Sequence, residues 1–176
     1  PAEEGLSKQE MIKATMKRAV EYAQSQYQGV YDYVTSLGID KPIHIGEAGW
    51  ASADSAAYGA NGSKASDEYK QKWFYEYMRE WTDQAGMSLF YFEVFDEQWK
   101  DASDGGGSEN HFGLIRLNNE VKYTLWDLVD DGSLSGLTRD NRPLVKSYGG
   151  DLTAMLDEVL NPPFKSTMPV RKITSV

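Results

Sequence analysis

The chain has 176 residues, of which 18 are basic and 27 acidic, so its formal net charge is −9 and its sequence pI is near 4.7. An acidic surface repels nucleic acid and anionic lipid, and no apolar run approaches the ~20 residues of a membrane-spanning helix. We therefore expect neither nucleic acid nor membrane as a partner. Aromatic residues make up 12% of the chain and cysteine is absent, which predicts one folded domain without disulfides.

The first predicted helix begins at a capping box and ends at a glycine. Ser7 and Glu10 have the spacing of that motif, and Gly38 is a typical C-terminal stop. Between them, apolar residues recur at helical steps of three and four, namely Ile12, Met16, Ala19, Ala23, Tyr27, Val30, Val34 and Leu37. A continuous helix of this span exceeds the usual globular length, so we expect a bend near Gly29.

A short strand and a long loop follow this helix. Residues 43–45 are β-prone and lead into the turn Gly46-Glu47-Ala48-Gly49-Trp50. His44 alternates with isoleucines there, which indicates a side chain packed beneath helices rather than a catalytic one. Residues 51–66 are rich in Ala, Ser and Gly and are expected to form a surface loop.

The next pair of elements is again a helix and a strand. A helix is predicted over residues 67–85 because its large apolar residues share one face and Gly86 follows; they are Trp73, Phe74, Tyr77, Met78, Trp81 and Ala85. We interpret this aromatic stripe as core packing. Residues 88–95 are almost all apolar, which predicts a strand buried on both faces, as in a parallel sheet.

The last third of the chain contains shorter elements. A hairpin is expected at residues 111–123 with its turn at Asn118-Asn119, and short helices at residues 122–131 and 151–160. Residues 161–176 have no amphipathic period and are expected to be an extended tail. Because helices and strands alternate, the sequence predicts an α/β fold built from βα units around a parallel sheet.

Carboxylates follow both predicted strands, Glu47 after the first and Asp96-Glu97 after the second. The carboxyl ends of parallel strands share one edge of the sheet, so these groups should meet there. The aromatic residues Trp50, Phe95 and Trp99 accompany them. Aromatic faces beside carboxylates suit a sugar substrate, since rings stack on its C–H faces and acids bind its hydroxyls or attack its anomeric carbon. The alternative is that the acids are solvated loop charges.

Three motifs, IGEAGWAS, FEVFDEQWK and SENHFGL, resemble in order and spacing the C-terminal part of glycoside hydrolase family 17, the β-1,3-glucanases and glucanosyltransferases. The resemblance covers about residues 30 to 125 and implies the portion of a (β/α)8 TIM barrel around strands 7 and 8 with flanking helices. It implies that Glu47 is the nucleophile, and that Glu97, Lys100 and Glu109 are charged residues near the catalytic carboxylates. Ala51 stands where the family usually has proline.

The second carboxyl group of a retaining mechanism is expected outside this chain. The family supplies the acid from an Asn-Glu pair ending strand 4, whereas the pair Asn119-Glu120 here follows the nucleophile and is predicted to be a turn. Residues 1–160 are therefore expected to be the C-terminal part of a barrel. Its N-terminal part, in the same protein or another chain, is the expected partner, because two parallel strands alone leave unpaired edges.

The function expected from these features is retaining hydrolysis of a laminarin-like β-1,3-glucan, in a secreted, periplasmic or cell-surface location. The alternatives are a non-catalytic glucan-binding protein and an inactive barrel fragment. Trp50, Phe95, Glu97, Trp99, Lys100, Glu109 and His111 are the expected substrate-binding residues. No cofactor or metal is expected, because the segment at residues 101–112 lacks the acid that closes a calcium loop.

Overall fold

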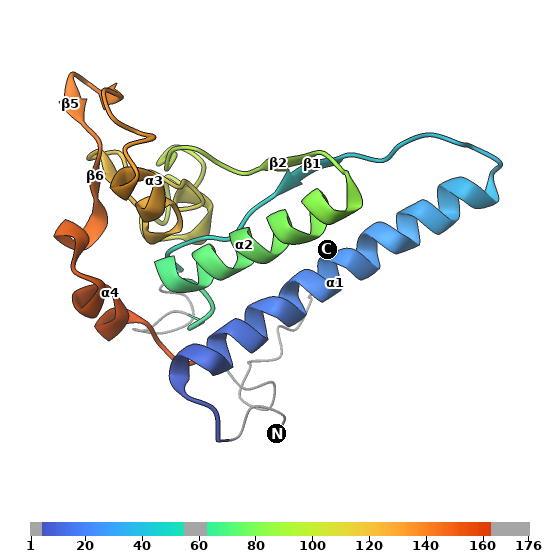
Figure 1. The fold of residues 1–176 in the computed structure, drawn as a ribbon, viewed down its shortest axis with the longest axis horizontal. Coiled ribbons are helices and arrows are strands. Elements are labelled where there is room, and N and C mark those ends of the chain that lie inside the picture. Colours follow the sequence, from blue (N-terminus) through green and yellow to red (C-terminus); the bar gives the residue numbers. More distant parts are fainter. Residues whose placement is uncertain (1–4, 55–62, 163–176) are drawn as a thin grey trace.

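The computed structural model describes residues 5–54 and 63–162, and its centre is a helix–strand–helix–strand unit (Figure 1). In chain order the unit consists of α1 (Lys8–Ser36), β1 (Ile45–Ala48), α2 (Glu68–Ala85) and β2 (Leu89–Tyr91). The two strands pair in parallel, with Ile45 opposite Leu89 and Ala48 opposite Tyr91. The predicted α/β class with a parallel strand pair is therefore confirmed for this unit.

The elements that follow β2 are short and lie beyond the N-terminal end of α2 (Figure 1). They are β3 (Glu120–Val121), α3 (Trp126–Asp130), β4 (Thr138–Arg139), β5 (Arg142–Pro143), β6 (Val145–Lys146) and α4 (Leu152–Glu158), joined by 3₁₀ turns. β3 pairs with β6 in parallel and β4 with β5 antiparallel. The predicted hairpin is confirmed, since Ile115 bridges Val121 in antiparallel fashion and Asn119 takes a positive φ of 77° at the turn.

The helix α1 confirms the predicted cap and lies within the predicted range from Ser7 to Gly38. The Ser7 side chain accepts from the backbone of Glu10, and the Glu10 side chain accepts from the backbone of Ser7. The expected bend near Gly29 is wrong, because the helix is continuous over 29 residues. An exposed glycine costs a helix only ~1 kcal/mol, which the neighbouring turns offset. Gly38, with a φ of 71°, follows the C-cap Leu37 as predicted.

The hydrophobic core lies between the two long helices and extends to the C-terminal elements. Its fully buried members come from α1, α2, α3 and α4 and are Ile12, Met16, Val20, Tyr69, Phe74, Met78, Trp126, Met155 and Val159. The predicted aromatic stripe of α2 packs here, with Trp73, Tyr77 and Trp81 against the edge of the core. Ala85, the last residue of the stripe, is exposed.

The strands differ from the prediction in position and in burial. The first strand spans Ile45–Ala48 rather than residues 43–45, so Glu47 lies within it. The second is not buried on both faces, because Tyr91 packs beside Tyr75 of α2 whereas Phe90 is 66% exposed. His44 is exposed, not packed beneath a helix. Among the described residues, helices cover one face of this strand pair, which leaves the other face open.

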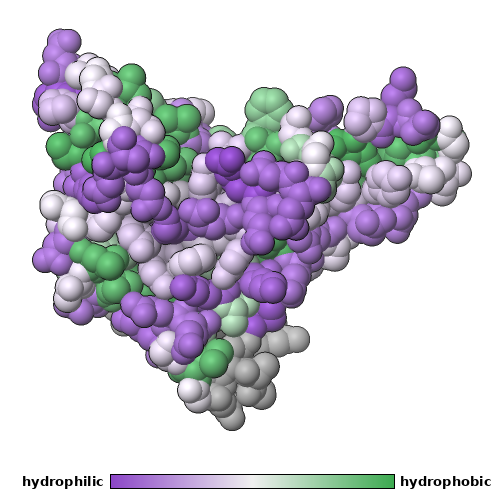
Figure 2. Space-filling model, in the orientation of Figure 1, coloured by the Kyte–Doolittle hydropathy of each residue, from purple (hydrophilic) through white to green (hydrophobic). Residues whose placement is uncertain are grey.

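The open side coincides with an apolar surface. Figure 2 shows hydrophobic side chains along the arm formed by the end of α1 and the chain leading to β1. Val30, Leu37, Ile39 and Phe90 are the large exposed apolar residues of this region. Contiguous apolar surface of this kind is typical of an interface.

The predicted tail lies outside the described residues from position 163 onward, as does the middle of the predicted loop at residues 51–66.

Gln71, in the second turn of α2, connects three separate segments of the chain. Its side chain is fully buried, and Nε2 donates to the backbone oxygens of Trp50, Phe112 and Gly113 at 3.0 to 3.1 Å. Its Oε1 accepts from the Thr124 hydroxyl at 3.4 Å. One amide therefore joins the turn after β1, the segment that follows β2 and the start of the 3₁₀ turn before α3.

Glu68 adds an ionic contact at the same end of α2. Its carboxylate is buried and accepts from Arg116, from the Tyr123 backbone N–H and from the Ser147 hydroxyl, each at 2.7 Å. Burial raises the pKa of Glu68, although Arg116 and the two hydrogen bonds oppose that shift. Buried polar groups are stable only with such partners, so this end of α2 specifies where the later segments attach.

Two glycines lie where segments of the chain come into close contact: Gly49 where the turn after β1 meets the segment after β2, and Gly113 where the hairpin meets that same segment. A Cβ atom on Gly49 would lie 2.0 Å from the Phe92 carbonyl oxygen, and one on Gly113 would lie 2.1 Å from the Asp96 backbone nitrogen. No side chain fits at either point, so glycine is required for the two segments to come this close.

Replacing Gln71 with leucine should lower the free energy of unfolding by at least about 2 kcal/mol, because three buried carbonyls lose their donor. Urea denaturation measures this loss. The matched control is Gln84→Leu, which changes an exposed glutamine of the same helix whose side-chain amide donates to Glu80. Equal losses in the two variants would contradict the role of Gln71.

Replacing Gly49 with alanine should destabilise the protein by about 1–3 kcal/mol, because the new methyl group overlaps the Phe92 carbonyl. The paired variant Gly46→Ala places a methyl group three residues earlier, within β1, with no described atom within 4 Å. Thermal unfolding of the two variants is the measurement. A Tm for Gly49→Ala equal to that of Gly46→Ala would show that the close approach is not tightly held.

Candidate functional site

A cavity of about 340 Å³ lies at the carboxyl ends of β1 and β2. Its charged lining residues are Glu47, Lys100 and Glu109. Its remaining walls are Ala48, Gly49 and the rings of Phe92 and Phe112. The parallel pairing explains why Glu47 and the segment after β2 meet here, since both strands end at the same edge. Two carboxylates, one cation and two aromatic rings thus converge on one cavity.

Lys100 is the cation of this site and is held from several sides. Its Nζ lies 3.3 Å from Glu93 Oε2, 3.1 Å from Glu97 Oε2 and 3.5 Å from the centroid of the Phe92 ring. The predicted neighbours Glu97 and Lys100 are therefore brought together. An ammonium group between two carboxylates and over a ring face has little freedom to leave the cavity wall.

The ionisation of this cluster departs from ordinary values. Burial and a hydrogen bond with Glu97 raise the pKa of Glu93 to about 7, against the opposing effect of Lys100. The hydrogen bond from Lys100 lowers the pKa of Glu97. For Lys100, burial alone acts to lower the pKa, but the contacts with Glu97 and Glu93 outweigh it and raise the pKa. Lys100 is therefore charged at neutral pH, and Glu93 is the group that titrates near it.

A buried ion pair supports the base of the site. Lys122 Nζ lies 2.6 Å from Asp96 Oδ1, and both side chains are buried. Lys122 also donates to the His111 carbonyl oxygen at 3.2 Å. Burial lowers the pKa of Lys122, and Asp96 opposes that shift. This pair ties the segment after β2 to the hairpin, one residue before Glu97.

The loop that contributes Glu109 is fixed by Asn110, which is fully buried. Its side-chain amide donates to the carbonyl oxygens of Asp101 and Asp104, and its Oδ1 accepts from the Asp101 backbone N–H at 2.8 Å. The next residue, His111, has its Nδ1 2.8 Å from the Gly107 carbonyl oxygen. Glu109 lines the cavity, whereas the Nδ1 side of the His111 ring is turned toward its own loop.

The three aromatic residues expected to bind substrate have different places. Trp50 packs against Phe74 of α2, with ring centroids 4.9 Å apart, and its Nε1 donates to the Ala65 carbonyl oxygen. Trp99 is 72% exposed, and its ring centroid is 5.8 Å from Lys100 Nζ. Phe95 lies beneath the Arg139 guanidinium at 5.4 Å and does not line the cavity. Phe92 and Phe112 form its aromatic walls instead.

Sequence reasoning missed Glu93, Phe92 and Phe112 as members of the site. Glu93 lies within the apolar run at residues 88–95, which is predicted to be a buried strand, so this acid is treated as one of the strand residues. The available signal was its spacing, because Glu93, Glu97 and Lys100 are separated by four and three residues. The pair Asn119-Glu120 is confirmed as a turn, with Asn119 donating to the Arg139 carbonyl oxygen and Glu120 paired with Arg116.

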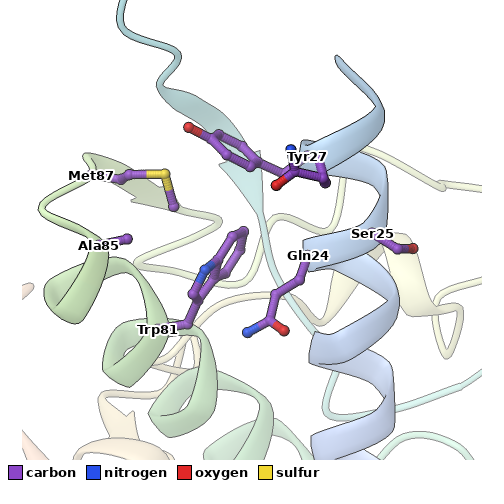
Figure 3. A pocket seen from close by; sticks show the side chains of 7 residues that line it. Gln24, Ser25, Tyr27, Trp81, Ala85 and Met87 are labelled. Atoms are coloured by element: carbon purple, nitrogen blue, oxygen red, sulfur yellow. The ribbon is translucent and has the colours of Figure 1, made fainter. Parts of the chain in front are cut away.

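A second cavity, of about 590 Å³, lies between α1 and α2 (Figure 3). Its lining is neutral and comprises Gln24, Ser25, Tyr27, Gln28, Trp81, Ala85 and Met87. Tyr27 and Trp81 meet edge to face there, with ring centroids 5.6 Å apart. Because this cavity has no acid or base in its lining, the cavity at Glu47 is the candidate for chemistry.

In residues 5–54 and 63–162, no group of three or more histidine, aspartate or glutamate side chains is arranged to hold a metal ion. Over the same ranges, no helix combines the length and the apolar character needed to cross a bilayer.

The chain resembles known proteins of one kind in both sequence and structure. An endo-laminarinase from Formosa Hel1_33_131 has 54% sequence identity and a TM-score of 0.89, over 96% of this chain and 43% of that chain. A glucan 1,3-beta-glucosidase of Arthroderma benhamiae is 34% identical, over 46% of this chain and 27% of its own length. One of the same name from Schizosaccharomyces pombe is 33% identical, over 46% of this chain and 23% of its own length. The chain thus spans about a quarter of the curated relatives and less than half of the laminarinase.

The family comparison agrees with these relatives. The family model of the glycosyl hydrolases family 17 matches residues 15–126, more than half of the chain, and this range includes Glu47, Glu93, Glu97, Lys100 and Glu109. The βαβ unit and the laminarinase likeness correspond to an α/β fold of the TIM-barrel type, in which sites lie at the carboxyl ends of strands. The chain belongs to family 17 of the glycosyl hydrolases.

Proposed function

We propose that this chain carries the nucleophile of a retaining glycoside hydrolase that acts on a laminarin-like β-1,3-glucan. The observation that carries the proposal is the cavity at the end of the parallel strands, where Glu47 lies with Lys100 and Glu109 between two aromatic rings. The name of the laminarinase relative supports the choice of substrate. A polymeric glucan is degraded outside the cytoplasm, so we propose a secreted, periplasmic or cell-surface location.

In the proposed reaction the Glu47 carboxylate attacks the anomeric carbon and forms a glycosyl–enzyme bond. The glycosidic C–O bond breaks at the same time, and a second carboxyl group donates its proton to the leaving oxygen. Water then attacks the anomeric carbon, transfers a proton to that second group, and releases Glu47. Lys100 lines the same cavity and contributes its positive charge there.

The proton donor is proposed to come from a part of the barrel that precedes this chain. Residues 1–160 are then the C-terminal part of the barrel, around strands 7 and 8. Two observations support this: the strand pair has one face not covered by described residues, and the chain aligns with 43% of the laminarinase. Glu97 and Glu109 are proposed to surround the sugar as polar neighbours, and Trp99 to offer an exposed aromatic face.

Glu47→Gln in the full-length protein should abolish laminarin hydrolysis while binding of the glucan survives. The amide keeps the shape of the side chain but cannot attack the anomeric carbon, so the loss should appear in kcat. The measurements are reducing-sugar release and glucan binding by calorimetry. Glu76→Gln, on α2 and outside the cavity, is the matched control and should remain active. Unchanged turnover in Glu47→Gln would disprove the assignment.

Residues 1–176 alone should show no laminarinase activity, and activity should return when the preceding part of the barrel is supplied. Without the proton donor the leaving group departs unassisted, which costs ~10²–10⁴-fold in rate. The open apolar face should also make the isolated chain associate. A laminarin assay run beside size-exclusion chromatography tests both points. Full activity from a monomer of these residues would mean that the acid lies within the chain. Binding without hydrolysis by the completed protein would favour a glucan-binding role.

A further inference from the structure

Glu93 is an acidic side chain for which the proposed reaction has no role. Its side chain is only 12% exposed, and it does not line the cavity at Glu47. Its Oε1 is buried and has no hydrogen-bond donor within the described part of the chain, whereas its Oε2 lies 3.3 Å from Lys100 Nζ. A group so placed cannot reach a sugar in the cavity. Any effect of Glu93 on the reaction must therefore pass through Lys100.

The backbone holds Glu93 in place from the neighbouring segment. Its N–H donates to the Phe112 carbonyl oxygen at 3.4 Å, and its carbonyl oxygen accepts from the Leu114 N–H at 2.9 Å. Lys100 is fixed in turn by Glu93, Glu97 and the face of Phe92, while it lines the cavity with Glu47. Two carboxylates with different exposure thus hold one cation against the cavity wall.

We propose that Glu93 is a positioning residue: together with Glu97 it holds the Lys100 ammonium at the wall of the Glu47 cavity, and its protonation state sets the net charge around that cation. The inference rests on the proposed function, because the consequence for catalysis is felt by Glu47. Lys100 is the link, since it touches Glu93 and lines the cavity of Glu47.

The charges around Glu93 determine the direction of the effect. Glu97 and Lys100 are the charged groups that face it, while the packed segment at residues 112–114 contributes backbone groups and the Phe112 ring. Burial and Glu97 raise the pKa of Glu93 to about 7. Below this pH Glu93 is neutral, so Lys100 is balanced by Glu97 alone and more net positive charge lies at the cavity wall. Above it a second negative charge pairs with Lys100 and lowers that net charge.

The pH dependence of kcat in the full-length protein tests the proposal, with laminarin as substrate. Wild type should show an inflection near pH 7 that is absent in Glu93→Gln, because the amide still accepts from Lys100 but does not titrate. KM should change by less than about twofold, since Glu93 does not touch substrate. Glu80→Gln, an exposed α2 variant distant in sequence from this cluster, should reproduce the wild-type profile. A Glu93→Gln profile that superimposes on wild type would overturn the proposal.

A second measurement tests Glu93 independently of the role of Glu47. Carboxyl NMR of protein labelled with ¹³C-glutamate should show one group with a midpoint near 7, lost in Glu93→Gln and moved to lower pH in Glu97→Gln. This titration can be recorded in Glu47→Gln, so it does not depend on activity. Absence of that signal overturns the inference even if Glu47→Gln is inactive. An active Glu47→Gln protein that shows the signal instead refutes the proposed function. If Glu93→Gln does not fold, the test is the NMR midpoint in Glu97→Gln. A midpoint that does not move to lower pH overturns the inference.

Discussion

The hydrogen bonds made by the N-terminal half of α2 are the constraint on which the rest of the structure depends. A buried amide or carboxylate is tolerated only when its polar atoms are matched. Gln71 meets this condition by donating to the backbone of two segments and accepting from the Thr124 hydroxyl of a third, and Glu68 by binding Arg116, Tyr123 and Ser147. Polar matching at this end of α2 therefore specifies where these segments attach. The geometry of the candidate site depends on how these segments are placed.

Two features at the carboxyl-terminal edge of the strand pair create the candidate site. Parallel pairing brings the ends of β1 and β2 together. Glycine at position 49 lets the turn after β1 approach the segment after β2, and glycine at position 113 lets the hairpin approach that segment. Glu47 then lines the same cavity as Lys100, a cation supplied by the segment after β2. Lys100 is itself confined by Glu93, Glu97 and Phe92, which is the kind of preorganisation that catalysis by charge requires.

The two glutamates that contact Lys100 differ in ionisation. Glu97 is half-buried and is held in its ionised form by Lys100, whereas burial keeps a proton on Glu93 to higher pH. Two similar side chains four residues apart therefore differ in ionisation because their surroundings differ. The strand pair and the segment that follows β2 also present exposed apolar residues, among them Phe90 and Val94.

The sequence by itself determined the features that depend on local patterns. The capping box at Ser7, the aromatic stripe of α2, the turn at Asn118-Asn119 and the carboxylates at the ends of two parallel strands all follow from periodicity and turn chemistry. The motifs around Glu47 and Lys100 were sufficient to indicate the family. These signals are short in range and do not need the fold to be interpreted.

Only the tertiary structure decided which side chains are buried and with what they pair. The shift of β1 onto Glu47, the exposure of His44, the packing of Trp50 against α2 and the shielding of Glu93 all depend on segments distant in sequence. An apolar run such as residues 88–95 predicts a strand, but the coverage of each face depends on what packs against it. Burial in turn sets the ionisation of Glu93, because desolvation is a property of the surroundings and not of the residue.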